Sequence, residues 1–323
     1  MAFVLELCRL SKHYPAHKAL DSISLEVPRG AFFSLLGPSG CGKTTTLRLV
    51  AGFEEPTSGE VRLNGASINS LKPYERNVST VFQNYALFPH LTVQQNVEFG
   101  LRQRRAPDPE RRAREAIAMV QLAGKESRYP AQISGGEKQR VALARSLVLE
   151  PEVLLLDEPL AALDPSLRKQ MRTELKDLQR RVGVAFLFVT HDQEEALTLS
   201  DRIAVMRQGR IEQVGTPEDV YLRPASRFVA GFLGAVNWVD GVGLRPEATR
   251  VSRTAPAADV RSLAATVANC VFLGNCVHVE AQLASGVPVV AEVPRQDGDY
   301  RPGEKVHVWW RASDEMRFTG ESE

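Results

Sequence analysis

A glycine-rich run at residues 37–44 is the first segment whose composition and spacing could bind a charged ligand. It has the sequence Gly-Pro-Ser-Gly-Cys-Gly-Lys-Thr, follows an expected strand (Ala31–Leu36) and precedes a helical pattern (Lys43–Ala51). Glycines permit a tight bend in which backbone N–H groups point at phosphate oxygens, and the positive end of the next helix adds to the attraction. Lys43 is expected to meet the β- and γ-phosphates of ATP, and the Thr44 hydroxyl to bind Mg²⁺. The residues predicted to hold the nucleotide here are Gly37, Pro38, Ser39, Gly40, Cys41, Gly42, Lys43, Thr44 and Thr45.

Two adjacent acids end a second apolar strand, Val153–Leu156. Side chains of neighbouring residues in a strand point in opposite directions, so the two acids need not share a role. Asp157 can support Mg²⁺, and Glu158 can face the water that attacks the terminal phosphate. Such a pair is weak evidence alone, but together with the glycine-rich loop it predicts nucleotide hydrolysis.

A second possible phosphate site lies in the run Ile-Ser-Gly-Gly-Glu-Lys-Gln-Arg at positions 133–140. Ser134 and the N–H groups of Gly135 and Gly136 would open a helix, and a helix N-terminus attracts anions. The run resembles the LSGGQ signature of ABC transporter ATPases, with isoleucine for the leucine and Glu137 for the glutamine. Within that family the chain is similar to importer subunits for polyamines, ferric iron, sulfate and maltose.

The resemblance implies an arrangement and several further roles. In the family, the signature of one subunit closes over the ATP held by the other, which implies a head-to-tail homodimer with two shared sites. Tyr14 matches the aromatic residue that stacks on adenine, Gln83 the glutamine that senses Mg²⁺ and water, and His191 the switch histidine that contacts the γ-phosphate. Asn84–Gly100 resembles the segment that touches the membrane subunits, and Leu160–Asp164 the loop that crosses the dimer interface.

Apolar periodicity predicts an α/β core with a largely parallel sheet. The resemblance implies that this core is an ABC ATPase domain at residues 1–236, with a helical subdomain at about 84–150. Continuous apolar runs indicate strands buried on both faces, whereas apolar residues spaced three and four positions apart indicate helices. The expected strands are Phe3–Leu7, Ile23–Val27, Ala31–Leu36, Val78–Phe82, Val153–Leu156 and Val184–Val189; the expected helices are Lys43–Ala51, Glu110–Leu122 and a helix from the signature to about Leu149.

The sequence pattern changes near residue 237. From there, short β-rich runs broken by Gly, Pro and Asp predict a small all-β, OB-like domain at 237–323. Gly243–Glu247 and Pro302–Arg317 resemble parts of the regulatory domain of importer ATPases, in abbreviated form. Leu222–Trp238 is the expected junction, and Ser252–Arg261 an expected loop. The expected strands of this domain are Ala264–Phe272, Val277–Leu283, Val287–Val293 and Lys305–Arg311.

Composition limits the partners. The chain has 323 residues and a net charge of +1, so no global field recruits nucleic acid. The arginine-rich stretch Arg102–Arg114 contains acids and prolines and no interleaved aromatic residues. We therefore expect a solvated surface segment and not a nucleic-acid-binding patch. Four scattered cysteines favour a reducing compartment over a disulfide framework or a CxxC metal site. No leader or membrane-spanning run is recognisable, so contact with a membrane would depend on partner subunits.

These features predict the ATP-binding subunit of an ABC importer, peripheral at the cytoplasmic face of the inner membrane. The resemblance implies two transmembrane permease subunits and an extracytoplasmic solute-binding protein as partners, and polyamine as the first expectation for the solute. Ferric iron, sulfate and sugar importers are alternatives. A soluble ABC ATPase acting on DNA or ribosomes is a further alternative, but it would usually have two cassettes or a coiled-coil insertion. A small-molecule kinase would leave the run at 133–140 unexplained.

Overall fold

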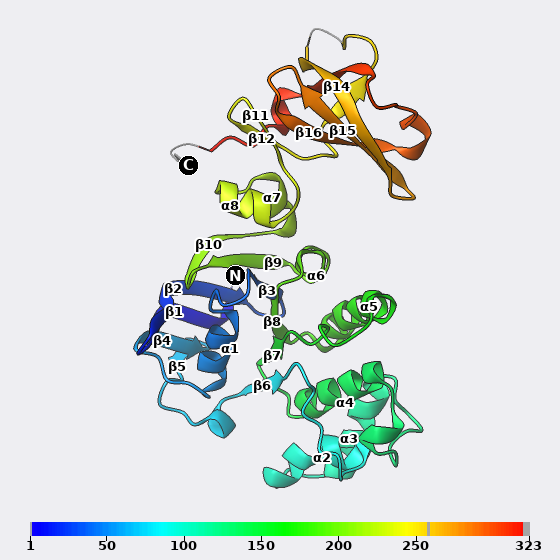
Figure 1. The fold of residues 1–323 in the computed structure, drawn as a ribbon. Coiled ribbons are helices and arrows are strands. Elements are labelled where there is room, and N and C mark those ends of the chain that lie inside the picture. The colour runs from blue at the N-terminus through cyan, green and yellow to red at the C-terminus, as the bar shows by residue number, and fades with distance from the viewer. Residues whose placement is uncertain (1, 257–258, 319–323) are drawn as a thin grey trace. The chain divides into compact units, whose positions relative to one another are not determined.

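The computed structural model describes residues 2–256 and 259–318, which form two compact units that divide between Pro217 and Glu218 (Figure 1). The change in sequence pattern predicted this boundary later in the chain, between residues 236 and 237. The difference arises because Arg245, in the β-rich unit, is buried and donates hydrogen bonds to the carbonyls of Tyr221 and Ala230 at 3.1 and 2.9 Å. The segment that the sequence marks as a junction is thereby part of the second unit.

The first unit is built on a six-stranded sheet with the order β10-β9-β3-β8-β7-β6, parallel except for β10. Its strands β3, β7 and β8 are apolar and almost wholly buried, as their continuous apolar sequences predict. The strands are β3 (Phe32–Leu36), β6 (Val78–Val81), β7 (Val153–Asp157), β8 (Ala185–Thr190), β9 (Arg202–Arg207) and β10 (Arg210–Gly215).

A separate antiparallel sheet of order β2-β1-β4-β5 holds the two N-terminal strands. The expected strands Phe3–Leu7 and Ile23–Val27 are therefore only parts of longer strands, and they do not join the parallel sheet. Register shifts along β1 and β2 interrupt the apolar alternation, which is why the sequence pattern ends early. The strands are β1 (Phe3–Tyr14), β2 (His17–Pro28), β4 (Ser58–Leu63) and β5 (Ala66–Ser67).

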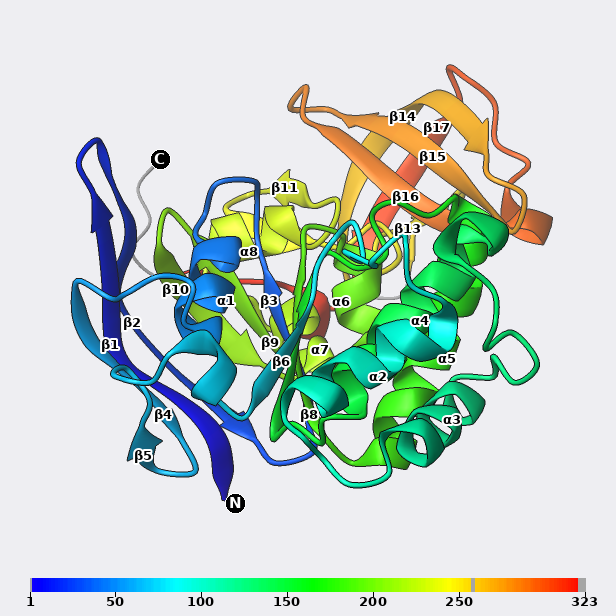
Figure 2. The same cartoon turned by 90° about the horizontal axis from the view of Figure 1, so that it is seen from below.

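The larger helices cover one face of the parallel sheet, and α1 with the antiparallel sheet covers the opposite face (Figures 1 and 2). One core joins Phe32, Phe186 and Phe188 to the larger helices, and the other joins the opposite face to α1 and the antiparallel sheet. The expected helix Glu110–Leu122 ends at Met119, because Gln121 has a left-handed backbone, and the signature helix ends at Leu147. The helices are α1 (Lys43–Ala51), α2 (Val93–Gln103), α3 (Pro109–Met119), α4 (Gly135–Leu147), α5 (Pro165–Val182) and α6 (Gln193–Leu199).

The second unit contains a five-stranded antiparallel sheet with the order β13-β17-β14-β15-β16. Alternate residues of β15 and β16 face its apolar core, as the β-rich runs predict. Between Ser252 and Arg261 the expected loop is present, although residues 257–258 lie outside the described residues. The elements are α7 (Pro217–Leu222), α8 (Arg227–Phe232), β11 (Asn237–Val239), β12 (Val242–Leu244), β13 (Arg250–Ser252), β14 (Arg261–Phe272), β15 (Cys276–Leu283), β16 (Pro288–Pro294) and β17 (Lys305–Trp310). Short 3₁₀ helices occupy Pro73–Glu75, Pro130–Gln132, Arg295–Asp297 and Ala312–Asp314.

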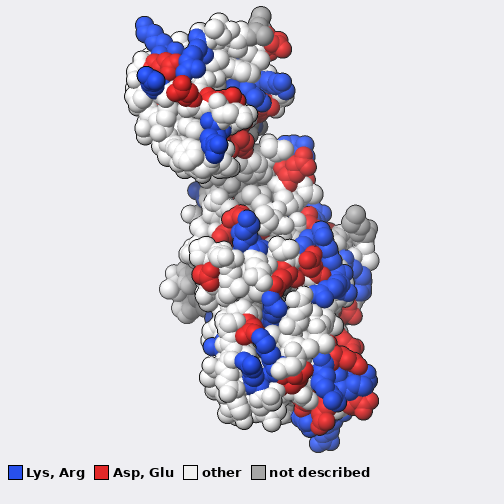
Figure 3. Space-filling model, turned by 90° about the vertical axis from the view of Figure 1, so that its right-hand side faces the viewer, with Lys and Arg blue, Asp and Glu red and all other residues white. Residues whose placement is uncertain are grey.

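Charges on the surface are mixed in sign. On the face drawn in Figure 3, basic and acidic groups lie side by side rather than in a field of one sign. Within the arginine-rich stretch, Arg102 pairs with Glu98 and Arg111 with Glu115, both at 2.7 Å. In the part of the chain that the structure describes, none of the helices combines the length and the apolar character needed to cross a bilayer.

Candidate nucleotide-binding site

The carboxyl edge of the parallel sheet gathers the main predicted site residues. Leu36 of β3 is in register with Thr190 of β8, and Asp157 of β7 is in register with Val189. The residues that follow these strands therefore leave the sheet at one edge, which is where open α/β sheets bind ligands. The glycine-rich loop, Glu158 and His191 are brought together by this topology.

The glycine-rich loop bends where a side chain could not be accommodated. A Cβ on Gly37 would lie 2.4 Å from the carbonyl oxygen of Met206. Gly42 has a φ of +106°, and a Cβ there would lie 2.7 Å from the carbonyl oxygen of Ala19. These glycines let the chain turn tightly against its neighbours and open α1 with free N–H groups, the geometry of a phosphate-binding loop.

The loop's lysine is a buried cation. Lys43 is 5% exposed, and its Nζ donates to the carbonyl oxygens of Gly37 and Pro38 at 2.6 and 3.0 Å. Because neutral carbonyls do not neutralise an ammonium, the positive charge remains available to an anion in the loop. Burial raises the pKa of the neighbouring Cys41 thiol, so Cys41 contributes no competing negative charge.

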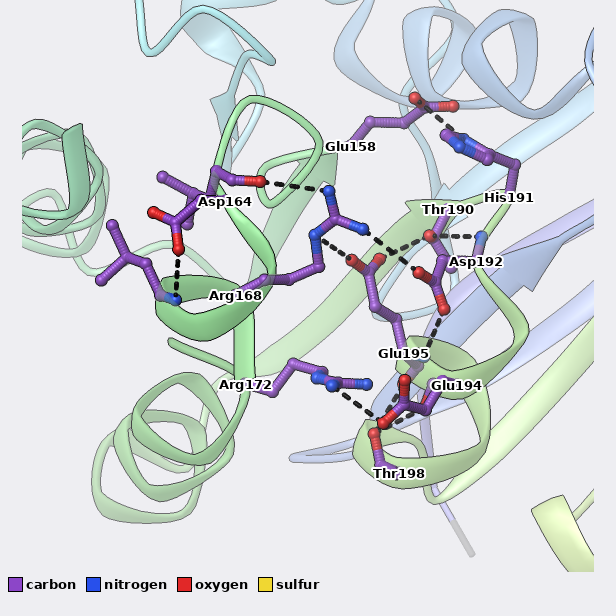
Figure 4. Close-up of polar contacts among 12 residues, drawn as sticks. Glu158, Asp164, Arg168, Arg172, Thr190, His191, Asp192, Glu194, Glu195 and Thr198 are labelled. Atoms are coloured by element: carbon purple, nitrogen blue, oxygen red, sulfur yellow. Dashed lines mark hydrogen bonds and ion pairs between the residues drawn. The ribbon is translucent and has the colours of Figure 1, made fainter. Parts of the chain in front are cut away.

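The two acids at the end of β7 point to different partners. The Thr44 hydroxyl donates to Asp157 Oδ1 at 3.2 Å, while Glu158 Oε2 lies 3.2 Å from His191 Nδ1 (Figure 4). Burial, followed by the charge of Glu158, raises the pKa of Asp157 above its usual value. Glu158 itself has a φ of +46°, a left-handed conformation that is uncommon outside glycine and is frequent at functional sites.

A partly buried polar network, which the sequence did not indicate, supports the segment that carries His191. Arg168 of α5 donates to the carbonyl oxygen of Leu163 at 3.1 Å and pairs with Asp192 at 3.5 Å (Figure 4). Glu195, only 4% exposed, accepts a hydrogen bond from the Thr190 hydroxyl at 2.6 Å, and burial raises its pKa. Arg168 thus joins the loop Leu160–Asp164 to the residues on both sides of His191.

Tyr14 lies at the end of β1 and is half-buried. Its ring stacks on His17 with centroids 5.3 Å apart. Burial and a hydrogen bond with Glu54 raise its pKa, and the Thr45 hydroxyl also contacts its phenol group. The position beside Thr45, in the first turn of α1, fits the predicted contact with a base next to the phosphate loop.

Gln83 is exposed and lies just beyond β6. Because Val81 is in register with Leu156 of β7, Gln83 leaves the sheet at the same edge as the acids. The chain then turns through Tyr85 and Ala86, whose carbonyl oxygens accept hydrogen bonds from Arg145 of α4 at 2.8 and 2.7 Å. Arg145, which the sequence analysis missed, connects the segment after Gln83 to the signature helix.

The signature run opens α4 as predicted, with Ser134 as its N-cap. The Ser134 hydroxyl accepts from the Glu137 N–H at 3.3 Å, and the Glu137 carboxylate accepts from the Ser134 N–H at 2.7 Å. Lys125 also bonds to Glu137, and this bond together with the hydrogen bond from the Ser134 N–H lowers the pKa of Glu137 to about 2. Gly136 packs against Leu167 of α5, where a Cβ would come within 3.3 Å.

The two predicted phosphate sites are separate within one chain. In both ribbon views, α1 and α4 lie well apart, with strands of the parallel sheet between them (Figures 1 and 2). The structure therefore brings Lys43, Thr44, Asp157, Glu158 and His191 together, and it does not bring Ser134 to them.

Comparison with known proteins agrees with these observations. A family model described as ABC transporter matches residues 20–161, and one described as TOBE domain matches residues 242–318. The spermidine/putrescine import ATP-binding protein of Rubrobacter xylanophilus is 49% identical, with 95% of this chain and 92% of the relative covered. The protein of the same name from Thermobifida fusca is 46% identical, with 88% and 85% covered.

Two solved structures are also similar. The ATP-binding cassette MJ0796, in a dimeric post-hydrolysis state bound to ADP and Pi, is 32% identical, with a TM-score of 0.58 and 66% of this chain and 98% of that chain covered. CbiO1 from Clostridium perfringens, part of the ABC transporter complex cbiONQ, is 30% identical, with a TM-score of 0.63 and 68% and 91% covered. This chain belongs to the family of ABC transporter ATP-binding subunits.

Proposed function

We propose that this chain hydrolyses ATP at two sites shared by a head-to-tail homodimer and thereby drives a polyamine importer. The observation that carries the proposal is the separation of two phosphate-binding helix N-termini in one chain. The glycine-rich loop has Asp157, Glu158 and His191 beside it, whereas Ser134 opens a helix in another part of the unit. A second copy, turned head to tail, would bring a signature helix to each loop.

The residues at the carboxyl edge of the sheet have the chemistry needed to bind ATP and Mg²⁺ for phosphoryl transfer. Lys43 would meet the β- and γ-phosphates, and Tyr14 would stack on the adenine. Thr44 and Asp157 place two oxygens 3.2 Å apart, a donor set that suits a hard cation. With Gln83 they would hold Mg²⁺, which neutralises phosphate charge when bound.

Glu158 and His191 would have different roles in hydrolysis. The Glu158 carboxylate would accept a hydrogen bond from the attacking water and orient it toward the γ-phosphate. His191, 3.2 Å from that carboxylate, would hold Glu158 and contact the transferred phosphate. Ser134, Gly135 and Gly136 of the partner copy would supply N–H groups and a helix dipole to the same phosphate.

The transport proposal rests on the names of several relatives. Those from Rubrobacter xylanophilus, Thermobifida fusca and Oleidesulfovibrio alaskensis, 49, 46 and 44% identical, are all described as spermidine/putrescine import ATP-binding proteins. By this likeness the chain would bind two permease subunits at the cytoplasmic face of the membrane, and an extracytoplasmic binding protein would deliver the solute.

The test is to purify the chain with the membrane subunits that it retains and to reconstitute the complex in proteoliposomes with its binding protein. ATP-dependent uptake of labelled spermidine or putrescine is the expected result. Uptake of ferric iron, sulfate or a sugar instead would contradict polyamine as the solute but would support the importer proposal. ATP hydrolysis without retained membrane subunits or uptake would contradict the importer proposal.

A further inference from the structure

The outer face of the β-rich unit carries a cluster of metal-binding atoms from Cys276, His278 and Glu292. His278 of β15 and Glu292 of β16 are cross-strand partners in register, and Cys276 lies two residues before His278. Successive side chains of a strand alternate between faces, so Cys276 and His278 share the face opposite the apolar core. One thiol, one imidazole and one carboxylate atom lie within 4.8 Å of one another.

The spacing suits a small tetrahedral ion. His278 Nε2 and Glu292 Oε2 are 3.4 Å apart. Two ligands that are each about 2.0–2.2 Å from a tetrahedral zinc ion lie roughly 3.3–3.6 Å from one another. The Cys276 Sγ lies within 4.8 Å of both atoms and would supply the third ligand, and water would take the fourth position.

The identity of the three ligands narrows the choice of ion. A thiolate and an imidazole favour zinc and neighbouring transition metals, whereas Mg²⁺ and Ca²⁺ prefer sets made only of oxygens. Cys276 is 8% exposed, while the side chains of His278 and Glu292 are 32 and 39% exposed. An ion could therefore enter from solvent and bind a thiol that is largely sheltered.

A simpler account is a surface ion pair between His278 and Glu292 beside an uninvolved cysteine. Such exposed pairs contribute little to stability and would not select a metal. Two of the three residues stand on one rigid strand and the third on its hydrogen-bonded neighbour, so the ligand atoms are held close before any ion binds.

We propose that Cys276, His278 and Glu292 form a binding site for Zn²⁺ or a similar divalent transition metal. The bound ion bridges β15 and β16 and stabilises the β-rich unit, because it binds the folded arrangement and not the unfolded chain. All three ligands lie in the second unit, so the site is independent of the nucleotide site and of the proposed transport function.

The experiment is a Co²⁺ titration of the full chain, freed of metal with chelator and followed by absorbance without nucleotide. We expect one equivalent of Co²⁺ to give a thiolate-to-metal charge-transfer band and the visible bands of a tetrahedral site, and Zn²⁺ to abolish both. Cys276→Ser should remove the charge-transfer band. Cys270→Ser is the matched control, because Cys270 lies in the adjacent strand β14 and outside the cluster, and it should retain the band.

A second measurement separates this site from metal bound by a thiol alone. His278→Ala and Glu292→Gln should each weaken Zn²⁺ affinity by about 10-fold or more, whereas His307→Ala on β17 should not. Zn²⁺ should raise the unfolding temperature of the parent chain and not that of the His278→Ala/Glu292→Gln double variant. Equal unfolding temperatures in chelator will show that the variants fold. A band that survives Cys276→Ser, no band in the parent chain, or unchanged affinity in both single variants would overturn the proposal.

Discussion

The glycine-rich loop at residues 37–44 and the signature run at 133–140 both open a helix with free N–H groups, yet their surroundings differ. The first lies at the carboxyl edge of the parallel sheet, where neighbouring strands end in Asp157, Glu158 and His191. The second follows a short 3₁₀ helix, Pro130–Gln132, and is not the continuation of a strand.

That difference in origin explains why the glycine-rich loop lies beside Asp157, Glu158 and His191, whereas the signature run does not. A loop that ends a parallel strand receives polar residues from the ends of adjacent strands, because all of these strands run in one direction. The signature run has no such neighbours, and Ser134 uses its hydroxyl to cap its own helix. The second loop can therefore offer backbone N–H groups and a dipole, and in the proposed dimer the acids would come from the other copy.

Lys43→Ala should have the largest effect, because it removes the buried cation of the glycine-rich loop. ATP affinity should fall about 100-fold, as expected for the loss of charge-assisted hydrogen bonds worth about 2–3 kcal/mol, and turnover should fall to background. Calorimetry with ATP and a phosphate-release assay measure the two effects. Lys305→Ala, at an exposed position of β17, is the control. Normal ATP binding and turnover in Lys43→Ala would show that the glycine-rich loop is not part of the nucleotide-binding site.

Glu158→Gln should lower turnover by about 10²–10⁴-fold, because an amide fills the same space but cannot take a proton from water. ATP binding should remain, so the variant should accumulate as an ATP-bound dimer. Light scattering with ATP and Mg²⁺ after gel filtration measures its mass. Glu152→Gln, at the partly exposed acid before β7, should hydrolyse ATP normally. Monomers only, in Glu158→Gln with ATP bound, would refute the shared site.

Sequence alone located both loops because each is a short contiguous run whose function depends on backbone N–H groups. It could not locate the network of Arg168, Asp192 and Glu195, because these partners meet only after α5 and α6 pack together. Helix α5 was also missed, although its signals were present: Asp164 caps it, and Met171, Leu175 and Leu178 are buried at helical spacing. Strands β1 and β2 lie in a separate antiparallel sheet, which the sequence did not predict, since an apolar pattern indicates a strand but not its partners.

Ser134→Arg tests the second loop, because a bulky cation at the exposed N-cap would block the approach of another copy's phosphate. ATP binding to single chains should persist, while the ATP-dependent dimer should be lost and turnover should fall about 100-fold. The same light-scattering assay, in the Glu158→Gln background, reports the dimer. Ser285→Arg, in the exposed turn between β15 and β16, should dimerise normally. A dimer of normal stability in Ser134→Arg would place the signature helix outside the interface.

Arg168→Ala should have a smaller effect on the first loop, because Arg168 positions His191 and does not touch the phosphates in this scheme. Losing its bonds to Leu163 and Asp192 should lower turnover by about 10- to 100-fold and leave ATP affinity unchanged. Arg168→Lys should restore part of the turnover, since it keeps the charge but not the fork of donors. Arg114→Ala, at an exposed position of α3, is the control. A loss of ATP affinity instead would indicate a structural role.

Glu137→Gln should have the smallest effect, and it tests how the second loop is held in place. The pKa of Glu137 is lowered to about 2, so its charge adds stability above pH about 4.5, and this stability is lost as the pH falls toward 2. Glutamine, the residue of the family signature, can keep the hydrogen bond to the Ser134 N–H but loses the attraction of Lys125.

The variant should therefore unfold in less urea than the parent chain at pH 7, and the difference should shrink at pH 3.5. Circular dichroism at both pH values measures the two midpoints. Glu115→Gln, an exposed acid paired with Arg111 on α3, controls for the removal of a surface charge. A difference that is the same at both pH values would mean that the carboxylate charge does not stabilise the signature helix. Equal midpoints of variant and parent at both pH values would mean that the cap depends on hydrogen bonds alone, which glutamine provides equally well.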